Sequence, residues 1–236
     1  MWDEAIMSTH VLSLGGSIVA PENIDIEFLK ALKQRLSAFL EADSDRRLIM
    51  VIGGGAPARA YQKALGQLAA DAPPEQADQI GIAATRLNAE LLRGVFVAYV
   101  HDPVVTDPTA DIEFTGRILV GAGWKPGFST DFDAVLLAER FGADSVINLS
   151  NIPKVYDKDP RSSPEAKPLD RISWADYRQM VGDTWTPGAN SPFDPVAAAK
   201  AMDLGLSVVV ASGRDLDTVE AVLTGAAFEG TVIGPK

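Results

Sequence analysis

Three times in this sequence, a short apolar run ends in a glycine-rich turn that leads into a helical pattern. The turns are Gly15-Gly16-Ser17, Gly53-Gly54-Gly55 and the stretch 121–134, which reads GAGWKPGFSTDFDA. Short continuous apolar runs are typical of strands buried on both faces, as in a parallel sheet. We therefore expect an α/β fold, with a mainly parallel sheet, right-handed connections and helices on both faces.

The remaining elements follow from the spacing of apolar residues. Predicted strands are 11–14, 48–52, 95–100, 118–120, 145–149, 207–211 and 230–233. Predicted helices are 25–40, 56–70, 75–93, 134–141, 173–181, 196–204 and 216–223, with Asp25 and Ser173 as N-caps. One face of the helix at 75–93 collects Ile80, Ala83, Ala84, Leu87 and Leu91. Segment 102–117 is expected to be an irregular excursion or a short hairpin, 153–168 a surface loop, and 182–195 is expected to be mobile.

Composition narrows the class of protein. The chain has 236 residues and a formal net charge of −11, with no basic cluster, so we expect no nucleic-acid partner and no binding to anionic membranes. It has no cysteine, which excludes disulfides and is consistent with a cytoplasmic protein. Its two histidines, His10 and His101, are too few for a histidine-rich metal site. No apolar run reaches membrane-spanning length, and no signal-peptide pattern occurs at the N-terminus.

The glycine turns are candidate anion sites. A glycine turn lets the backbone approach a ligand closely, and the helix that follows presents free N–H groups, an arrangement suited to phosphate. In a parallel sheet all such turns lie at the carboxyl ends of the strands, so the three can serve one ligand with several phosphates, or two phosphorylated ligands. There is no GxxxxGK[ST] loop and no protein-kinase motif set. Gly53-x-Gly55-x-x-Ala58 resembles a dinucleotide fingerprint, but the acid expected about 20 residues later falls in a turn between helices.

Six segments occur in an order that resembles the amino acid kinase superfamily, and most of all its archaeal-type uridylate (UMP) kinase branch. They are LGGS, VIGGG followed by Arg59, ADQIGI, WKPGFSTDFDA, LSNIPKVYDKDP and FDPVAA. The resemblance covers about residues 11–233. It implies a three-layer α/β/α sandwich, transfer of the ATP γ-phosphate to UMP with Mg²⁺, and assembly into a homo-oligomer, usually a hexamer. It also implies one domain, 1–236, with an acceptor-nucleotide lobe at about 1–140 and an ATP lobe at about 141–236.

The same resemblance implies site residues. On the ATP side these are Gly16, Ser17, Gly55, Arg59, Ser150, Asn151, Tyr156 and Asp159. On the UMP side they are Gly54, Asp78, Trp124, Lys125, Pro126, Gly127, Phe128, Ser129 and Thr130. Asp78 matches an acid that accepts hydrogen bonds from the UMP ribose, and Thr130 lies near the α-phosphate in the family pattern.

One departure from the superfamily pattern bears on catalysis. Ser13 stands where the superfamily has a lysine that neutralises the transferred phosphate. Our hypothesis is that Lys125 supplies that cation, with Arg59 and Asp131 as the other candidate catalytic residues. No acid is an obvious dedicated metal ligand, so Mg²⁺ is expected to be held chiefly by ATP oxygens and water, with Asp131 as a candidate partner.

Two alternatives to a UMP kinase remain at this point. One is a superfamily kinase with another small phosphate or carboxylate acceptor. The other is a nucleotide-binding storage or regulatory protein on the same scaffold, which the serine at position 13 keeps open.

Overall fold

The computed structural model describes residues 8–182 and 191–235. Within these residues, seven strands form one sheet in the order β3-β2-β1-β4-β8-β9-β7. The strands of this sheet are β1 (Thr9–Leu14), β2 (Arg47–Ile52), β3 (Ile118–Gly121), β4 (Ser145–Ser150), β7 (Arg171–Ser173), β8 (Ser207–Ser212) and β9 (Thr231–Gly234). The first five strands from β3 to β8 pair in parallel, whereas β9 is antiparallel to β8 and parallel to β7. The expectation of a mainly parallel sheet is confirmed.

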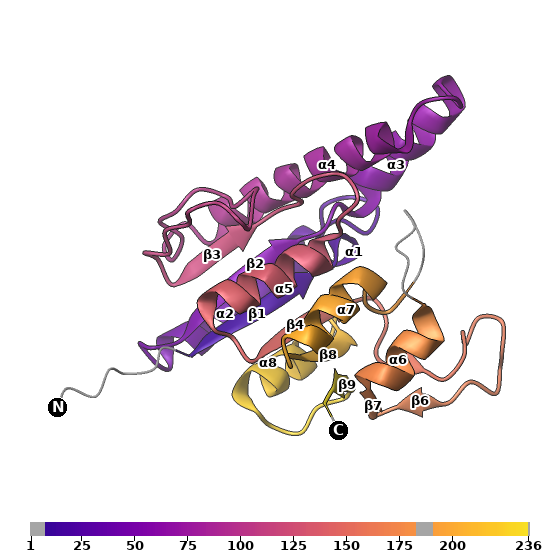
Figure 1. The fold of residues 1–236 in the computed structure, drawn as a ribbon. Coiled ribbons are helices and arrows are strands. Elements are labelled where there is room, and N and C mark those ends of the chain that lie inside the picture. The colour runs from indigo at the N-terminus through magenta and orange to yellow at the C-terminus, as the bar shows by residue number, and fades with distance from the viewer. Residues whose placement is uncertain (1–7, 183–190, 236) are drawn as a thin grey trace.

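Helices cover both faces of the sheet and produce three layers (Figure 1). One apolar core lies between the sheet and α1 (Gly16–Val19), α2 (Ile26–Glu41), α4 (Pro74–Val95) and α8 (Leu216–Thr224). The other lies between the opposite face and α5 (Thr130–Phe141), α6 (Trp174–Val181) and α7 (Pro195–Asp203). Alternate residues of each central strand point to opposite cores, as the pleat requires: Leu12 packs in the first core and Val11 in the second. This is the predicted α/β/α sandwich.

Helix α3 (Gly55–Leu68) packs against α4, and Figure 1 shows this pair extending beyond the sheet. The apolar face predicted on this second helix is not the face that meets the core. Ile82, Ala89 and Leu92 are buried, whereas Leu87 is 68% exposed and Leu91 is 36% exposed. The periodicity located the helix, but two apolar stripes compete on it, and only packing decides which one is covered.

The strand predicted at 95–100 is wrong. Helix α4 continues to Val95, and residues 96–99 form a turn that buries Phe96. The apolar side chains of this run fill the end of the first core without joining the sheet. The polar excursion that follows is held by the buried Asp102, whose carboxylate accepts hydrogen bonds from the backbone N–H groups of Thr115 and Gly116.

The segment 153–168, predicted as a surface loop, contains a two-stranded hairpin. Its strands are β5 (Val155–Tyr156) and β6 (Pro168–Leu169), paired antiparallel. Strand β7 and the short helix α1 were also not predicted, and both are only three or four residues long. Residues 183–190 of the segment predicted to be mobile lie outside the described residues, whereas Phe193 and Asp194 in the same segment are buried. No helix in the described parts of the chain is long and apolar enough to cross a membrane.

Candidate active site at the rim of the sheet

The first two glycine turns interlock. A Cβ atom on Gly16 would lie 2.0 Å from the backbone nitrogen of Gly55 and 2.6 Å from the carbonyl carbon of Gly53. Gly55 has a φ of 65°, and a Cβ atom there would lie 2.4 Å from the carbonyl oxygen of Gly16. Only glycine allows this approach of backbone to backbone. These two turns, both predicted to hold phosphates, therefore form one continuous backbone surface at the ends of β1 and β2.

Arg59 reaches from α3 to the first turn. Its Nη1 donates to the Ser17 hydroxyl over 3.2 Å, and its Nη2 donates to the carbonyl oxygen of Pro21 over 3.2 Å. The side chain is exposed. The structure thus brings Gly16, Ser17, Gly55 and Arg59, four of the predicted ATP-side residues, to one place.

The third turn leaves β3, the neighbour of β2. Ser129 caps α5, and its hydroxyl accepts a hydrogen bond from the backbone N–H of Phe132. Gly127 has a φ of 87°, in the left-handed region that favours glycine. Thr130 opens the helix, so its N–H belongs to the free donors of the first turn. The acceptor loop, as we call residues 123–130, therefore ends in the helix N-terminus that the sequence predicts for an anion.

Aromatic rings hold Lys125 within the acceptor loop. Its Nζ lies 3.6 Å from the ring centroid of Trp124 and 5.1 Å from that of Phe128. The Phe128 ring also stacks on Phe132, with centroids 4.7 Å apart. A cation over an aromatic face at an exposed site gains about 0.5–1 kcal/mol, which is less than a phosphate contact can provide. Lys125 is exposed and can exchange the rings for an anion.

Asp78 also belongs to the acceptor loop's surroundings. Its Oδ2 accepts a hydrogen bond of 3.0 Å from the backbone N–H of Gly127. The Asp78 residue is half-buried. The acid predicted to meet a ribose thus sits against the predicted acceptor site.

Asp131 lies half-buried in the first turn of α5, against the end of β1. Its Oδ1 accepts a hydrogen bond of 2.8 Å from the Ser13 hydroxyl, and its Oδ2 accepts one of 3.1 Å from the backbone N–H of Asp194. Burial raises the pKa of Asp131 to about 6, against these two hydrogen bonds, which lower it. The serine that replaces the superfamily lysine is therefore a direct partner of the candidate catalytic acid.

A second acid lies two residues further along the same helix. Asp133 is 1% exposed, and its Oδ2 accepts a hydrogen bond from the backbone N–H of Trp124, at the start of the acceptor loop. Its Oδ1 is buried and has no hydrogen-bond partner among the described residues. Burial raises the pKa of Asp133 to about 7, and the nearby Asp131 adds to the shift.

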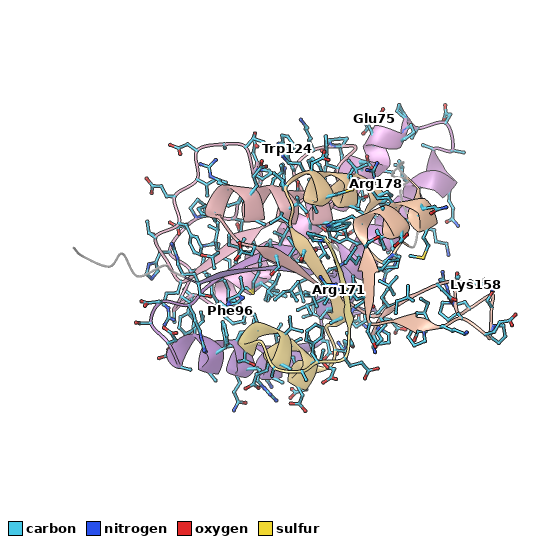
Figure 2. The ribbon with its side chains drawn as sticks, turned by 60° about the horizontal axis from the view of Figure 1, so that its bottom comes forward. Glu75, Phe96, Trp124, Lys158, Arg171 and Arg178 are labelled. Atoms are coloured by element: carbon cyan, nitrogen blue, oxygen red, sulfur yellow. The ribbon has the colours of Figure 1, made fainter. Side chains whose placement is uncertain are left out.

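The predicted residues on the far side of the rim are more dispersed. The Ser150 carbonyl at the end of β4 accepts from the N–H of Gly213, so the ends of β4 and β8 meet the rim, with Asn151 exposed beside them. Tyr156 lies in β5, half-buried. Asp159 forms an ion pair with Arg161 over 2.9 Å, in a loop that Figure 2 shows projecting from the body of the molecule around Lys158. The structure does not bring Asp159 together with the glycine turns.

Three residues of α4 that the sequence did not single out for a role contact these turns. Asn88 donates to the carbonyl oxygens of Gly53 and Gly54, Thr85 accepts from the N–H of Gly123, and Arg86 donates to the carbonyl oxygens of Gly123 and Trp124. A buried asparagine on a helix that packs against a glycine turn would have been the available signal. It could not be used, because the sequence does not say which face of α4 is inside.

The described residues do not form a protein cage for a metal ion. They contain no group of three or more His, Cys, Asp or Glu side chains that could hold one. Both oxygens of Asp131 are already hydrogen-bonded, as given above. A metal ion would therefore have to compete with these two hydrogen bonds for Asp131.

Comparison with known proteins identifies the family of this fold and rim. The profile of the amino acid kinase family matches residues 8–212. The chain belongs to the amino acid kinase family. Among individual relatives, the chain is 37% identical to the uridylate kinase of Methanospirillum hungatei over 230 residues, covering 96% of this chain and 95% of the relative. It is 34% identical to the uridylate kinase of Pyrococcus abyssi, with 95% and 99% covered.

Solved structures of the amino acid kinase fold agree. The uridylate kinase from Archaeoglobus fulgidus superposes with a TM-score of 0.81 and 33% identity, covering 97% of this chain and all of the other. The UMP kinase from Bacillus anthracis superposes with a TM-score of 0.76 at 19% identity, over 96% of each chain, which supports the fold alone. The resemblance inferred from six segments is confirmed at the level of family and fold.

Proposed function

We propose that this protein is a UMP kinase, which transfers the γ-phosphate of ATP to UMP and gives UDP and ADP. The observation that carries the proposal is the arrangement of its three glycine turns. Two of them interlock at the ends of β1 and β2, and the third leaves the adjacent parallel strand β3. Two nucleotides can therefore meet head to head at one rim, and the relatives named above are uridylate kinases.

The residues divide between the two nucleotides. On the donor side, the N–H groups of the Gly16-Ser17 and Gly55 turns and the Arg59 guanidinium would bind ATP phosphates, with Ser150, Asn151, Tyr156 and Asp159 toward its base and ribose. On the acceptor side, Gly54, Asp78 and the loop 124–130 would bind UMP. Asp78 would give up its hydrogen bond to Gly127 N–H, or use its second oxygen, to accept from the ribose hydroxyls. The acceptor half would correspond to about residues 1–140, which also contribute the donor-side turns and Arg59, and the ATP half to about 141–236.

The reaction is an in-line displacement. An oxygen of the UMP phosphate forms a bond to the γ-phosphorus as the bond from that phosphorus to the β–γ bridging oxygen breaks, and ADP leaves with the electron pair. Negative charge on the transferred group must be neutralised, and Ser13 cannot do this. Arg59 from the donor side and Lys125, released from the rings of Trp124 and Phe128, would supply it. Asp131, held by Ser13 and Asp194, would keep the start of α5 in place beneath the acceptor phosphate.

Mg²⁺ is expected to accompany ATP. It would supply positive charge that neutralises part of the charge on the nucleotide phosphates. Phosphate oxygens of ATP and water would hold it, with Asp131 as the candidate protein partner.

A coupled assay with ATP, Mg²⁺ and a panel of UMP, CMP, dTMP, AMP and GMP tests the proposal. We expect UMP to give the highest kcat/KM, with UDP and ADP formed in equal amounts. Phosphorylation of a different acceptor alone would replace the proposal with another member of the family. Nucleotide binding without turnover of any acceptor would favour a storage or regulatory role.

We also propose that the protein is a cytoplasmic homo-oligomer. The exposed stripe of α4, formed by Ala83, Leu87 and Leu91 with Val97 just beyond it, supports a contact with a second copy. Light scattering after size exclusion should give a mass above that of the single chain, and Leu87→Lys should lower it. A wild-type mass of one chain would contradict the oligomer, including the hexamer typical of the family.

A further inference from the structure

A side chain of helix α4 hydrogen-bonds to the second glycine turn. Asn88 is 2% exposed, and its Nδ2 donates to the carbonyl oxygen of Gly53 over 2.8 Å and to that of Gly54 over 3.1 Å. A Cβ atom on Gly54 would also lie 3.3 Å from the carbonyl oxygen of Gly81 on the same helix. Fixing two successive carbonyls fixes the planes of the two peptides, and so the directions of the Gly54 and Gly55 N–H groups.

Two side chains of the same helix hydrogen-bond to the acceptor loop. The buried Thr85 hydroxyl accepts from the N–H of Gly123 over 2.8 Å and donates to the carbonyl of Ile82 over 2.6 Å. The Arg86 Nη2 donates to the carbonyl of Trp124 over 3.2 Å and to that of Gly123 over 3.4 Å. The loop is thus held at its first two residues by side chains that are adjacent on α4.

These contacts lie close together along one rigid element. Thr85, Arg86 and Asn88 fall within one turn of helix, and Asp78, which accepts from Gly127 N–H, lies ten residues before Asn88, or about 15 Å at the rise of an α-helix. The sheet alone sets the separation of the strand ends at β2 and β3, but it does not set the direction of the turns that leave them.

We propose that α4 holds the second glycine turn and the acceptor loop in a fixed relation, with Asn88, Thr85 and Arg86 as positioning residues for the phosphate-transfer geometry. The inference rests on the proposed function, because it assigns the two turns to the two nucleotides. Asn88 acts on the turn shared by both nucleotides, whereas Thr85 and Arg86 act only on the acceptor loop. Misplacement of a reacting group by about 1 Å can cost a large factor in rate.

Thr85→Val is the first test, with Thr85→Ser as its matched control. Valine keeps the shape but leaves the Gly123 N–H unpaired, whereas serine keeps the hydroxyl. We expect the KM for the acceptor to rise about tenfold in Thr85→Val, from the loss of one buried hydrogen bond, and to stay within about twofold in Thr85→Ser. The KM for ATP should not change in either variant. A general loss of structure would instead change both KM values.

Arg86→Lys is the second test, with Arg93→Lys as its control. A lysine cannot span two carbonyl oxygens as a guanidinium can. Arg93 lies seven residues further along the same helix and pairs with Glu90 over 2.7 Å. We expect a rise of about fivefold in the acceptor KM for Arg86→Lys and no change for Arg93→Lys.

Asn88→Leu is the third variant, and it should affect both nucleotides, whereas the first two variants should affect only the acceptor. It removes both donors to the Gly53 and Gly54 carbonyls at similar side-chain volume. We expect KM to rise for both nucleotides and kcat to fall at least tenfold. Thermal unfolding shows whether Asn88→Leu is folded. If it is not, the Thr85→Val and Arg86→Lys variants provide the test.

Hydrogen exchange read by mass spectrometry provides a measure that needs no turnover. Exchange should rise in peptides covering 123–127 for Thr85→Val and Arg86→Lys, and in peptides covering 53–56 for Asn88→Leu. Unchanged exchange in these peptides, or an equal rise of both KM values for Thr85→Val, would overturn the inference. If the wild type does not phosphorylate UMP, the proposed function fails, and the exchange pattern still decides whether α4 holds the two turns.

Discussion

The second glycine turn and the acceptor loop are both predicted to bind nucleotide, but they are built in opposite ways. Gly53-Gly54-Gly55 is packed backbone to backbone against Gly16, so space itself requires glycine. A Cβ atom added to Gly127 in the acceptor loop would meet nothing within 4 Å among the described residues beyond its chain neighbours, and only the φ of 87° favours glycine there. The glycine turn is rigid because it is crowded. The acceptor loop is open, and side chains from α4 and α5 determine its shape.

Gly16→Ala should destabilise the protein more than any other variant proposed here. A small loss of stability would show that the second glycine turn is not crowded. Its Cβ would clash with backbone atoms at 2.0 and 2.6 Å, and neither neighbour is a flexible side chain. We expect a loss of about 3 kcal/mol or more in the free energy of unfolding, measured by urea titration, with activity abolished. Gly66→Ala on α3 is the control, since nothing lies within 4 Å of its Cβ outside the helix backbone, and it should be neutral or slightly stabilising.

Lys125→Ala tests whether the open loop supplies charge to the reaction. We expect kcat to fall at least about a hundredfold, as for removal of one group that stabilises transition-state charge, with the free energy of unfolding changed by less than about 1 kcal/mol. Steady-state kinetics at saturating UMP and ATP provide the measurement. A kcat within about twofold of the wild type would exclude Lys125 and leave Arg59 as the candidate cation.

The buried Asp133 beneath the open loop predicts a dependence of stability on pH. Its pKa of about 7 in the folded protein is above the unfolded value, so the folded state binds the extra proton between about pH 4 and pH 7. The free energy of unfolding should therefore fall as pH rises through this window, by up to about 1.4 kcal/mol per pH unit from this group. Asp133→Asn keeps an oxygen for Trp124 N–H and should flatten the slope. Urea titrations at pH 5 and pH 7 that give the same difference in both proteins would contradict this.

Gly127→Ala should have the smallest effect, because the loop is open there. A non-glycine residue in the left-handed region costs about 1 kcal/mol, and no neighbour has to move. We expect the KM for UMP to rise about fivefold at most, with kcat and the KM for ATP unchanged. An effect as large as that of Gly16→Ala would show that the acceptor loop is as tightly packed as the second turn.

Patterns of residues close together in the sequence were sufficient to predict much of the secondary structure and the fold class of this protein. Continuous apolar runs followed by glycine turns predicted the parallel strands, because a strand buried on both faces has no polar side to alternate. Asp25 and Ser173 were predicted as N-caps, and both accept the expected backbone hydrogen bonds, because capping depends on residues three positions apart. The positions of the three turns at one rim followed from the parallel sheet alone.

Tertiary packing decided what depends on distant residues. The run at 95–100 was apolar enough for a strand, but it fills the end of a core. The face of α4 that is buried determined that Asn88 and Thr85 meet the glycine turns while Leu87 is exposed. Ser13 and Asp131 lie 118 residues apart, and only the folded chain makes them partners. A sequence records the chemistry of each side chain and its local spacing, whereas the direction in which it points depends on free energies of burial summed over the whole molecule.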